Sequence, residues 1–181
     1  MKKISSSVNQ TLKLGIRIAG RLKGGEIILL SGCLGTGKTV LAKGIAQGLG
    51  VNKNQVISPT FVLLRLYQGK HLLQHFDFYR LKTAQELFAL GLQEYFYSDA
   101  VTIIEWPERL KFLLPKEFLK IKLVTKGGSL RHFEFFAQGS KYKELLEKIM
   151  NPAPAKDLSF KKRRAGIIIN KKKVRNEDTR D

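Results

Sequence analysis

Apolar positions recur with two different periods along the first part of the chain, and this pattern predicts alternating helices and strands. Helical spacing of apolar residues predicts a helix over residues 8–23, which Gly24-Gly25 ends. The continuous apolar run within residues 26–31 is typical of a strand that is buried on both faces of a parallel sheet. A glycine-rich loop follows this run, and the next helix is predicted over residues 38–49.

The rest of the patterned region predicts further strands and helices. Strands are expected over residues 62–67, 71–79, 100–106, 120–124 and 132–136, and helices over residues 83–91 and 140–150. Short turns with glycine would join the first two of these strands, and also the last two, into antiparallel hairpins. Strands that alternate with helices favour one α/β domain, which we place at residues 1–150.

The pattern changes after Met150. Residues 151–154 contain two prolines, and two basic clusters then flank the apolar residues 167–169. Ten basic and four acidic residues lie between positions 151 and 181, so six of the eighteen net positive charges lie in this segment. We expect residues 151–181 to be a disordered basic extension that attracts tRNA without sequence specificity or has no function.

Composition narrows the class of protein. No apolar run is long enough to span a bilayer, and the N-terminal lysines lack the apolar stretch of a signal peptide. The single cysteine, Cys33, excludes an internal disulfide. We therefore expect a cytoplasmic protein that does not contact membranes. The net charge of +18 favours partners rich in phosphate, nucleic acid above all.

Residues 32–39 form the most specific motif in the chain. Their sequence, GCLGTGKT, matches the pattern G-x-x-x-x-G-K-[ST] between a predicted strand and a predicted helix. The glycines allow a tight turn that directs backbone N–H groups at phosphates, and the helix dipole favours an anion at the same place. Lys38 would contact the β- and γ-phosphates of ATP or GTP, and the Thr39 hydroxyl would coordinate Mg²⁺. The motif and the predicted elements therefore favour a three-layer P-loop NTPase fold, with a mostly parallel central sheet and an antiparallel hairpin addition.

A P-loop site also needs an acidic residue at the end of a neighbouring strand. Glu105 ends the predicted strand 100–106 and fits this role, although an ordinary carboxylate at a strand end would look the same. Asp77 lies among the bulky residues of HFDFYR and is a second candidate. A charge in that setting needs a partner, which could be Mg²⁺, a nucleophilic water, or Arg80 or another basic residue in a salt bridge.

Four further residues have two readings from sequence alone. Thr60, in the tripeptide Ser-Pro-Thr, could sense the γ-phosphate or simply form a turn. His75 fits a structural role better than a catalytic one. Trp106 could lie in the core or over the site, and Arg80 could stabilise transferred charge or be solvated.

Taken together, these motifs resemble one family. They occur in the order GCLGTGKT, SPT, HFDFYRL, EL and EWP, and the likeness extends from about Val8 to Met150. The set resembles the TsaE family, the bacterial P-loop ATPases of tRNA threonylcarbamoyladenosine synthesis. The glycine-rich motif by itself would be generic, whereas the joint occurrence of the other segments is specific.

The resemblance implies a function. TsaE-like proteins bind and hydrolyse ATP in a complex with TsaD and TsaB, which transfers threonylcarbamoyl to adenosine 37 of tRNAs that read codons beginning with A. TsaE is not the transferase, and its ATPase cycle resets the transferase for further turnovers. The cofactors implied are ATP and Mg²⁺, and the implied partners are TsaD-like and TsaB-like proteins, with tRNA contacted indirectly or through the basic surface.

The resemblance also implies roles for individual residues. Thr39 and Glu105 would hold magnesium, Asp77 would support the metal or position water, and Thr60 would lie on a switch-like loop. The nucleotide would be contacted by the motif and by flanking residues, namely Thr11, Leu34, Gly35, Thr36, Gly37, Lys38, Thr39 and Trp106. Two features depart from the family: Cys33 stands where an acidic residue is usual, and the basic extension lies outside the usual domain.

Two other functions share some of these features. A small-molecule kinase has the same phosphate motif but needs a closing lid, and no obvious lid insertion is visible in the sequence. A nucleotide-switched RNA-binding module would use hydrolysis only to time the release of RNA. The three readings differ in whether ATP is consumed without a small acceptor and whether tRNA and partner proteins alter the rate.

Overall fold

The computed structural model describes residues 1–151 apart from residues 53, 82, 97, 111 and 112. The predicted basic extension lies outside the described residues except for Asn151, so its nature stays a prediction. Within the described part of the chain, no helix combines the length and apolar character that crossing a membrane requires.

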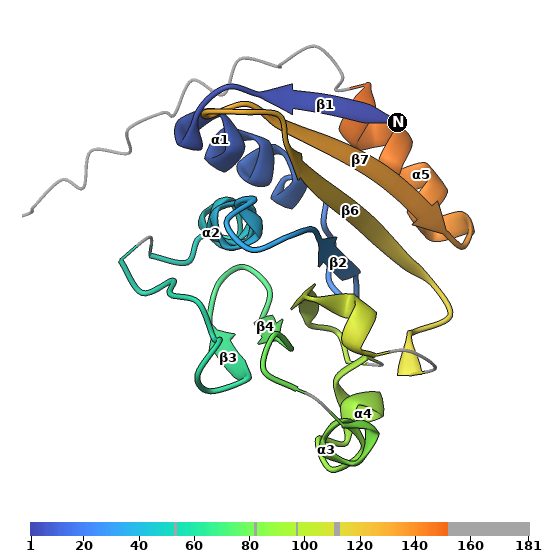
Figure 1. Ribbon diagram of the computed structural model, residues 1–181. Helices are drawn as coiled ribbons and strands as arrows, with labels where there is room; N and C mark the ends of the chain where they lie inside the picture. The colour runs from blue at the N-terminus through green and yellow to red at the C-terminus, as the bar shows by residue number, and fades with distance from the viewer. Residues whose placement is uncertain (53, 82, 97, 111–112, 152–181) are drawn as a thin grey trace, which may run out of the picture.

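A seven-stranded sheet forms the centre of the molecule (Figure 1). Its strand order is β1-β7-β6-β2-β5-β4-β3. The strands are β1 (Lys2–Ser5), β2 (Ile27–Ser31), β3 (Leu64–Tyr67), β4 (Leu73–Asp77), β5 (Val101–Glu105), β6 (Phe118–Thr125) and β7 (Arg131–Gln138). The middle strands β6, β2, β5 and β4 run parallel to one another, while β1, β7 and β3 pair antiparallel. The parallel centre and both predicted hairpins are confirmed, and β1 adds an antiparallel pair with β7 that was not predicted.

Helices cover both faces of the sheet. Apolar residues of α1 (Val8–Ala19), α2 (Lys38–Gly48) and α5 (Ser140–Met150) pack on one face. The opposite face of the central strands packs against α3 (Ala84–Phe88), α4 (Leu92–Phe96) and the 3₁₀ turn η1 (Pro107–Arg109). All five residues of β2 and of β5 are buried, as a strand covered on both sides requires. The three-layer arrangement is therefore confirmed for the central strands.

Three elements differ from the sequence prediction. β1 was not predicted, because its first residues carry no apolar pattern and the strand forms only by pairing with β7. α1 ends at Ala19, with Gly20 as its C-cap, and not at residue 23 as predicted. The predicted helix 83–91 is shorter than expected, and α4 follows it after Gly91. Thr83 caps α3 through a reciprocal capping box with Glu86.

Glycines bring α1 and α2 into backbone contact, which fixes α1 beside the helix that follows the glycine-rich motif. A Cβ atom added at Gly44 would lie 2.4 Å from the carbonyl oxygen of Leu12, and one at Gly15 would lie 2.6 Å from that of Leu41. Both distances are shorter than a van der Waals contact. The contacted atoms belong to the backbone, which cannot rotate away as a side chain could. The helices must therefore separate if either position carries a side chain.

We expect Gly44→Ala to lower the free energy of unfolding by about 1–3 kcal/mol, the usual cost of overpacking a core. Gly20→Ala is the matched control, because Gly20 has a φ of −63° and its added Cβ would lie 3.6 Å from the nearest atom. That control should stay within about 0.5 kcal/mol of the wild type. Urea denaturation followed by circular dichroism measures both, and equal midpoints would contradict the close packing.

Candidate functional site

The loop between β2 and α2 combines glycines of positive φ with the N-terminus of a helix, two features that phosphate binding requires. Gly35 and Gly37 adopt φ angles of +77° and +99°, which side chains disfavour, and Gly37 caps the N-terminus of α2. Space is open where a Cβ atom would stand at either position, so the glycines are required by conformation rather than by crowding. The N-terminus of α2 therefore faces open space, where free N–H groups and the helix dipole attract an anion.

Internal contacts hold this loop in shape. The Thr36 hydroxyl donates a hydrogen bond of 2.9 Å to the carbonyl oxygen of Cys33. From β7, the Arg131 guanidinium donates to the carbonyl oxygens of Thr36 and Gly128 at 3.2 and 2.7 Å. Thr36 was predicted to contact nucleotide, and its side chain stabilises the loop. Arg131 also stabilises the loop, but no sequence motif pointed to it.

Lys38, the first residue of α2, has a buried side chain that lies against the loop. Its ammonium group donates to the carbonyl oxygens of Gly32 and Cys33 at 2.8 and 3.0 Å and lies 3.9 Å from the centroid of a Trp106 ring. Burial lowers the pKa of Lys38 below its ordinary value, against the opposing effect of nearby carboxylates, first Glu105. The cation is therefore held in place, without a direct ion pair among the described residues, where a phosphate would meet it.

The two candidate carboxylates lie together because of strand register. Asp77 and Glu105 are direct partners at the C-terminal ends of β4 and β5, and Glu105 also lies opposite Leu30 of β2, just before the loop. Side chains alternate along a strand, so both carboxylates project on the face that carries α2. Their exposed fractions are only 3% and 2%.

Glu105 is held by two partners. The Thr39 hydroxyl donates to its Oε2 atom at 3.0 Å, and Nε2 of His75 lies 2.9 Å from its Oε1 atom. His75 is completely buried. The sequence supported a structural role for His75, and the fold makes that role specific: it fixes the orientation of Glu105. Its position two residues before Asp77, on the same strand face, was the available signal.

Asp77 is surrounded by hydrogen-bond donors from the 58–60 segment. Its Oδ2 atom accepts from the hydroxyls of Thr60 at 2.5 Å and Ser58 at 3.3 Å, and its Oδ1 atom accepts from the backbone N–H of Tyr79 at 2.9 Å. Arg80 instead lies over the ring of Phe61, 4.1 Å from its centroid. The alternative reading, a salt bridge between Asp77 and Arg80, is therefore wrong in this structure.

These groups open onto one cavity of about 390 Å³. It is lined by Leu34, Gly35, Gly37, Lys38, Thr39, Val40, Ser58, Thr60, Asp77, Tyr79, Glu105 and Trp106. Trp106 has a left-handed backbone, with φ 60° and ψ 50°, and its ring lies 4.9 Å from that of Tyr79. Left-handed conformations of bulky residues are costly and are found at functional sites. Tyr79, absent from the sequence prediction, joins Trp106 as an aromatic wall.

Two residues that were predicted to contact the nucleotide, Leu34 and Thr11, lie at the edge of the loop cavity or outside it. Leu34 is 72% exposed at the tip of the loop. Thr11 is buried, and its hydroxyl already bonds to the Ser5 hydroxyl at 2.9 Å. Thr11 borders a separate cavity of about 190 Å³ that also touches Gly35 and Arg131. It therefore lies beside the loop but not in the cavity that holds the carboxylates.

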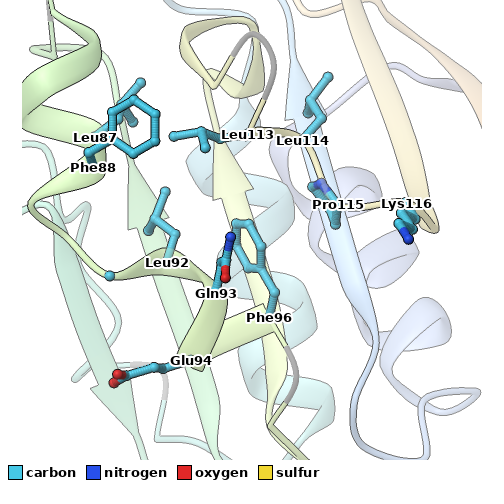
Figure 2. A pocket seen from close by; sticks show the side chains of 11 residues that line it. Leu87, Phe88, Leu92, Gln93, Glu94, Phe96, Leu113, Leu114, Pro115 and Lys116 are labelled. Carbon is cyan, nitrogen blue, oxygen red and sulfur yellow. The ribbon is translucent and has the colours of Figure 1, made fainter.

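Another cavity of about 390 Å³ lies on the opposite side of the sheet, between α3, α4 and residues 113–116 (Figure 2). Its lining is mainly apolar, and Figure 2 shows Leu92 and Leu113 directed into the space while Glu94 points away. It lacks the buried carboxylates, hydroxyls and lysine of the loop cavity. The candidate site is therefore the cavity at the loop.

The loop cavity has the groups that a magnesium nucleotide requires. A hydroxyl and a carboxylate, from Thr39 and Glu105, lie within hydrogen-bond distance, with Lys38 and a helix N-terminus beside them. No cluster of three or more His, Cys, Asp or Glu side chains suited to a metal is found among the described residues. Mg²⁺ needs no such cluster, because it binds through one or two protein oxygens, waters and phosphates.

Comparison with known proteins identifies a matching family and relatives that carry the same description as that family. The sequence model of a family described as threonylcarbamoyl adenosine biosynthesis protein TsaE matches residues 5–133. The chain is 39% identical to the tRNA threonylcarbamoyladenosine biosynthesis protein TsaE of Treponema pallidum, over 68% of this chain and 90% of that relative. Identity to the protein of the same name from Bacillus subtilis is also 39%, over 70% and 79%. The crystal structure of Bacillus subtilis YdiB matches with a TM-score of 0.70 and 31% identity, over 83% of this chain and 93% of that one.

Proposed function

The chain belongs to the TsaE family of threonylcarbamoyl adenosine biosynthesis proteins, and we propose that it binds and hydrolyses ATP with Mg²⁺ in that pathway of tRNA modification. Its membership confirms the resemblance inferred from the motifs. The ATPase activity is the finer part of the proposal. The observation that supports it is the convergence of Lys38, Thr39 and Glu105 on one cavity at the end of a glycine-rich loop.

In the proposed mechanism, the P-loop binds the triphosphate through its backbone N–H groups and Lys38. Lys38 would exchange the carbonyl oxygens of Gly32 and Cys33 for phosphate oxygens, so it is already placed and desolvated before the nucleotide arrives. Thr39 and Glu105 would hold Mg²⁺, which when bound neutralises charge on the phosphates. His75 keeps one oxygen of Glu105 occupied and thereby limits the rotation of the carboxylate.

Asp77 is proposed to orient the water that attacks the γ-phosphate. The same carboxylate accepts hydrogen bonds from Ser58 and Thr60, so the 58–60 segment is tied to the catalytic group. A change in the position of Asp77 would move Thr60 with it. This coupling supports the reading of residues 58–60 as a nucleotide-sensing loop.

The proposed partners follow from the family. We propose that the ATPase works with TsaD-like and TsaB-like proteins on tRNA, at adenosine 37, and that the other proteins perform the transfer. Leu34 and Tyr79 line the cavity and are exposed, and the exposed Phe61 follows Thr60 in the chain, so apolar surface is available for such contacts.

The decisive measurement is phosphate release from ATP and Mg²⁺ with no small-molecule acceptor present. We expect release by the full-length chain, faster when TsaD-like and TsaB-like proteins are added, and none when EDTA removes the metal. A small-molecule kinase would instead consume ATP in proportion to an acceptor. Absence of hydrolysis in the complete mixture, despite ATP binding, would contradict the ATPase proposal.

A further inference from the structure

The N-terminal 25 residues have an unusual charge balance. They contain six cations, at positions 2, 3, 13, 17, 21 and 23, and no acidic residue. The first carboxylate of the chain, Glu26, is buried and accepts hydrogen bonds from the backbone N–H groups of Lys23 and Gly24. Its carboxylate therefore binds backbone N–H groups, and no ion pair between it and one of these cations is found among the described residues.

Three of these cations line one groove. β1 is the outermost strand of the sheet, and α1 follows it directly. A groove of about 440 Å³ between them is lined by Lys3, Ile4, Gln10, Lys13, Leu14, Ile16 and Arg17. In the part of the chain that the structure describes, neither Lys3, Lys13 nor Arg17 forms an ion pair. Lys13 and Arg17 lie four residues apart on one helix face, where like charges repel.

Charged residues also lie beyond the groove, across β1, β7 and β6. Glu134 of β7 lies between Lys2 of β1 and Lys122 of β6, in register with both, and pairs with Lys2 at 3.6 Å. Figure 1 shows β1, β7 and β6 side by side, with no described helix in front of them. Because Glu134 offsets the charge of Lys2, this row adds one further cation, Lys122, for which no ion pair is found among the described residues.

We propose that the groove between β1 and α1, the β1–α1 groove, binds the sugar-phosphate backbone of RNA; the choice of tRNA as the natural ligand rests on the proposed function. The groove cations Lys3, Lys13 and Arg17 come from both β1 and α1, so the positive charge is spread over more than one helix. This spread fits an extended polyanion better than a short acidic segment. The basic extension is excluded as the occupant by its own positive charge. Because α1 packs against α2, RNA in this groove lies one helix away from the P-loop.

The test compares tRNA binding by two full-length triple variants of equal charge. The groove variant carries Lys3→Gln, Lys13→Gln and Arg17→Gln. The control variant carries Lys70→Gln, Lys116→Gln and Lys143→Gln, which are exposed positions outside the groove. Both keep the basic extension. An unmodified tRNA transcript is titrated by fluorescence anisotropy between about 50 and about 300 mM salt.

We expect the groove variant to lower tRNA affinity at least about tenfold near 0.1 M salt and to reduce the slope of log affinity against log salt by about 2, since each lost phosphate contact contributes about 0.7–0.9. The control variant should change the slope by less than about 0.5. ATP affinity and thermal unfolding should match the wild type in both variants, which separates this result from a failure of the ATPase proposal.

Two outcomes would overturn the proposal. Equal losses in the groove and control variants would mean that diffuse charge, not the groove, attracts RNA. An oligoglutamate peptide serves as a competing probe. If the groove variant lost binding of that peptide and kept wild-type tRNA affinity, the groove would be a site for an acidic protein segment.

Discussion

Lys38→Ala is expected to lower the affinity for ATP and Mg²⁺ by about 100-fold. The change removes a buried cation that is already aligned by the carbonyl oxygens of Gly32 and Cys33. Hydrogen bonds to charged groups contribute about 1.5–3 kcal/mol each, and the upper part of that range corresponds to this loss. Isothermal titration calorimetry measures the affinity directly.

Lys43→Ala is the matched control for this variant. Lys43 lies on the same helix, α2, but is only half-buried and does not line the loop cavity. Its affinity for ATP should stay within about twofold of the wild type, because a surface substitution of this kind changes free energies by about 0.5 kcal/mol or less. If Lys38→Ala also retained normal affinity, the phosphate-loop assignment would fail.

Glu105→Gln and Asp77→Asn are each expected to reduce turnover by about 100- to 1000-fold, the scale typical of losing a preorganised electrostatic group. Both replacements keep the size of the side chain and a hydrogen-bonding oxygen, so ATP affinity should change far less than turnover. The carboxylate charge of Glu105 is proposed to matter for the metal, and that of Asp77 for the attacking water. Steady-state phosphate release and nucleotide titration, measured on the same preparations, separate the two effects.

Glu108→Gln controls for the loss of one negative charge near the site. Glu108 is exposed on η1 and lies close enough to raise the pKa of Lys38, but it does not line the loop cavity. Its turnover should stay within a few-fold of the wild type. Wild-type turnover in Glu105→Gln or in Asp77→Asn would remove that residue from the mechanism.

Local sequence pattern was sufficient to predict most of the fold. β2, β5, both hairpins, α2 and α5 occur at or within a few residues of their predicted bounds, because apolar periodicity and glycine stops are local signals. β1 escaped prediction because its stability comes from pairing with β7, more than a hundred residues away in the chain. Such pairing leaves no periodic trace in the strand itself.

The sequence by itself determined the family and the glycine-rich loop, and it was sufficient to propose Asp77 and Glu105 as the two site carboxylates. The glycines in residues 32–39 favour a tight turn, and the lysine and threonine place a cation and a hydroxyl beside it. These are local properties that do not depend on the rest of the chain. The family assignment inferred from these motifs is the one that the relatives bear out.

Only the tertiary structure decided which groups meet. Strand order sets β4 beside β5, so Asp77 and Glu105 face the loop together, and His75 becomes the partner of Glu105. In the same fold, Arg80 lies over the ring of Phe61 and does not pair with Asp77. A long side chain such as that of arginine can reach several groups, so its partner depends on which groups pack nearby and not on its neighbours in sequence. Contacts between distant segments depend on register and packing, and no local pattern encodes them.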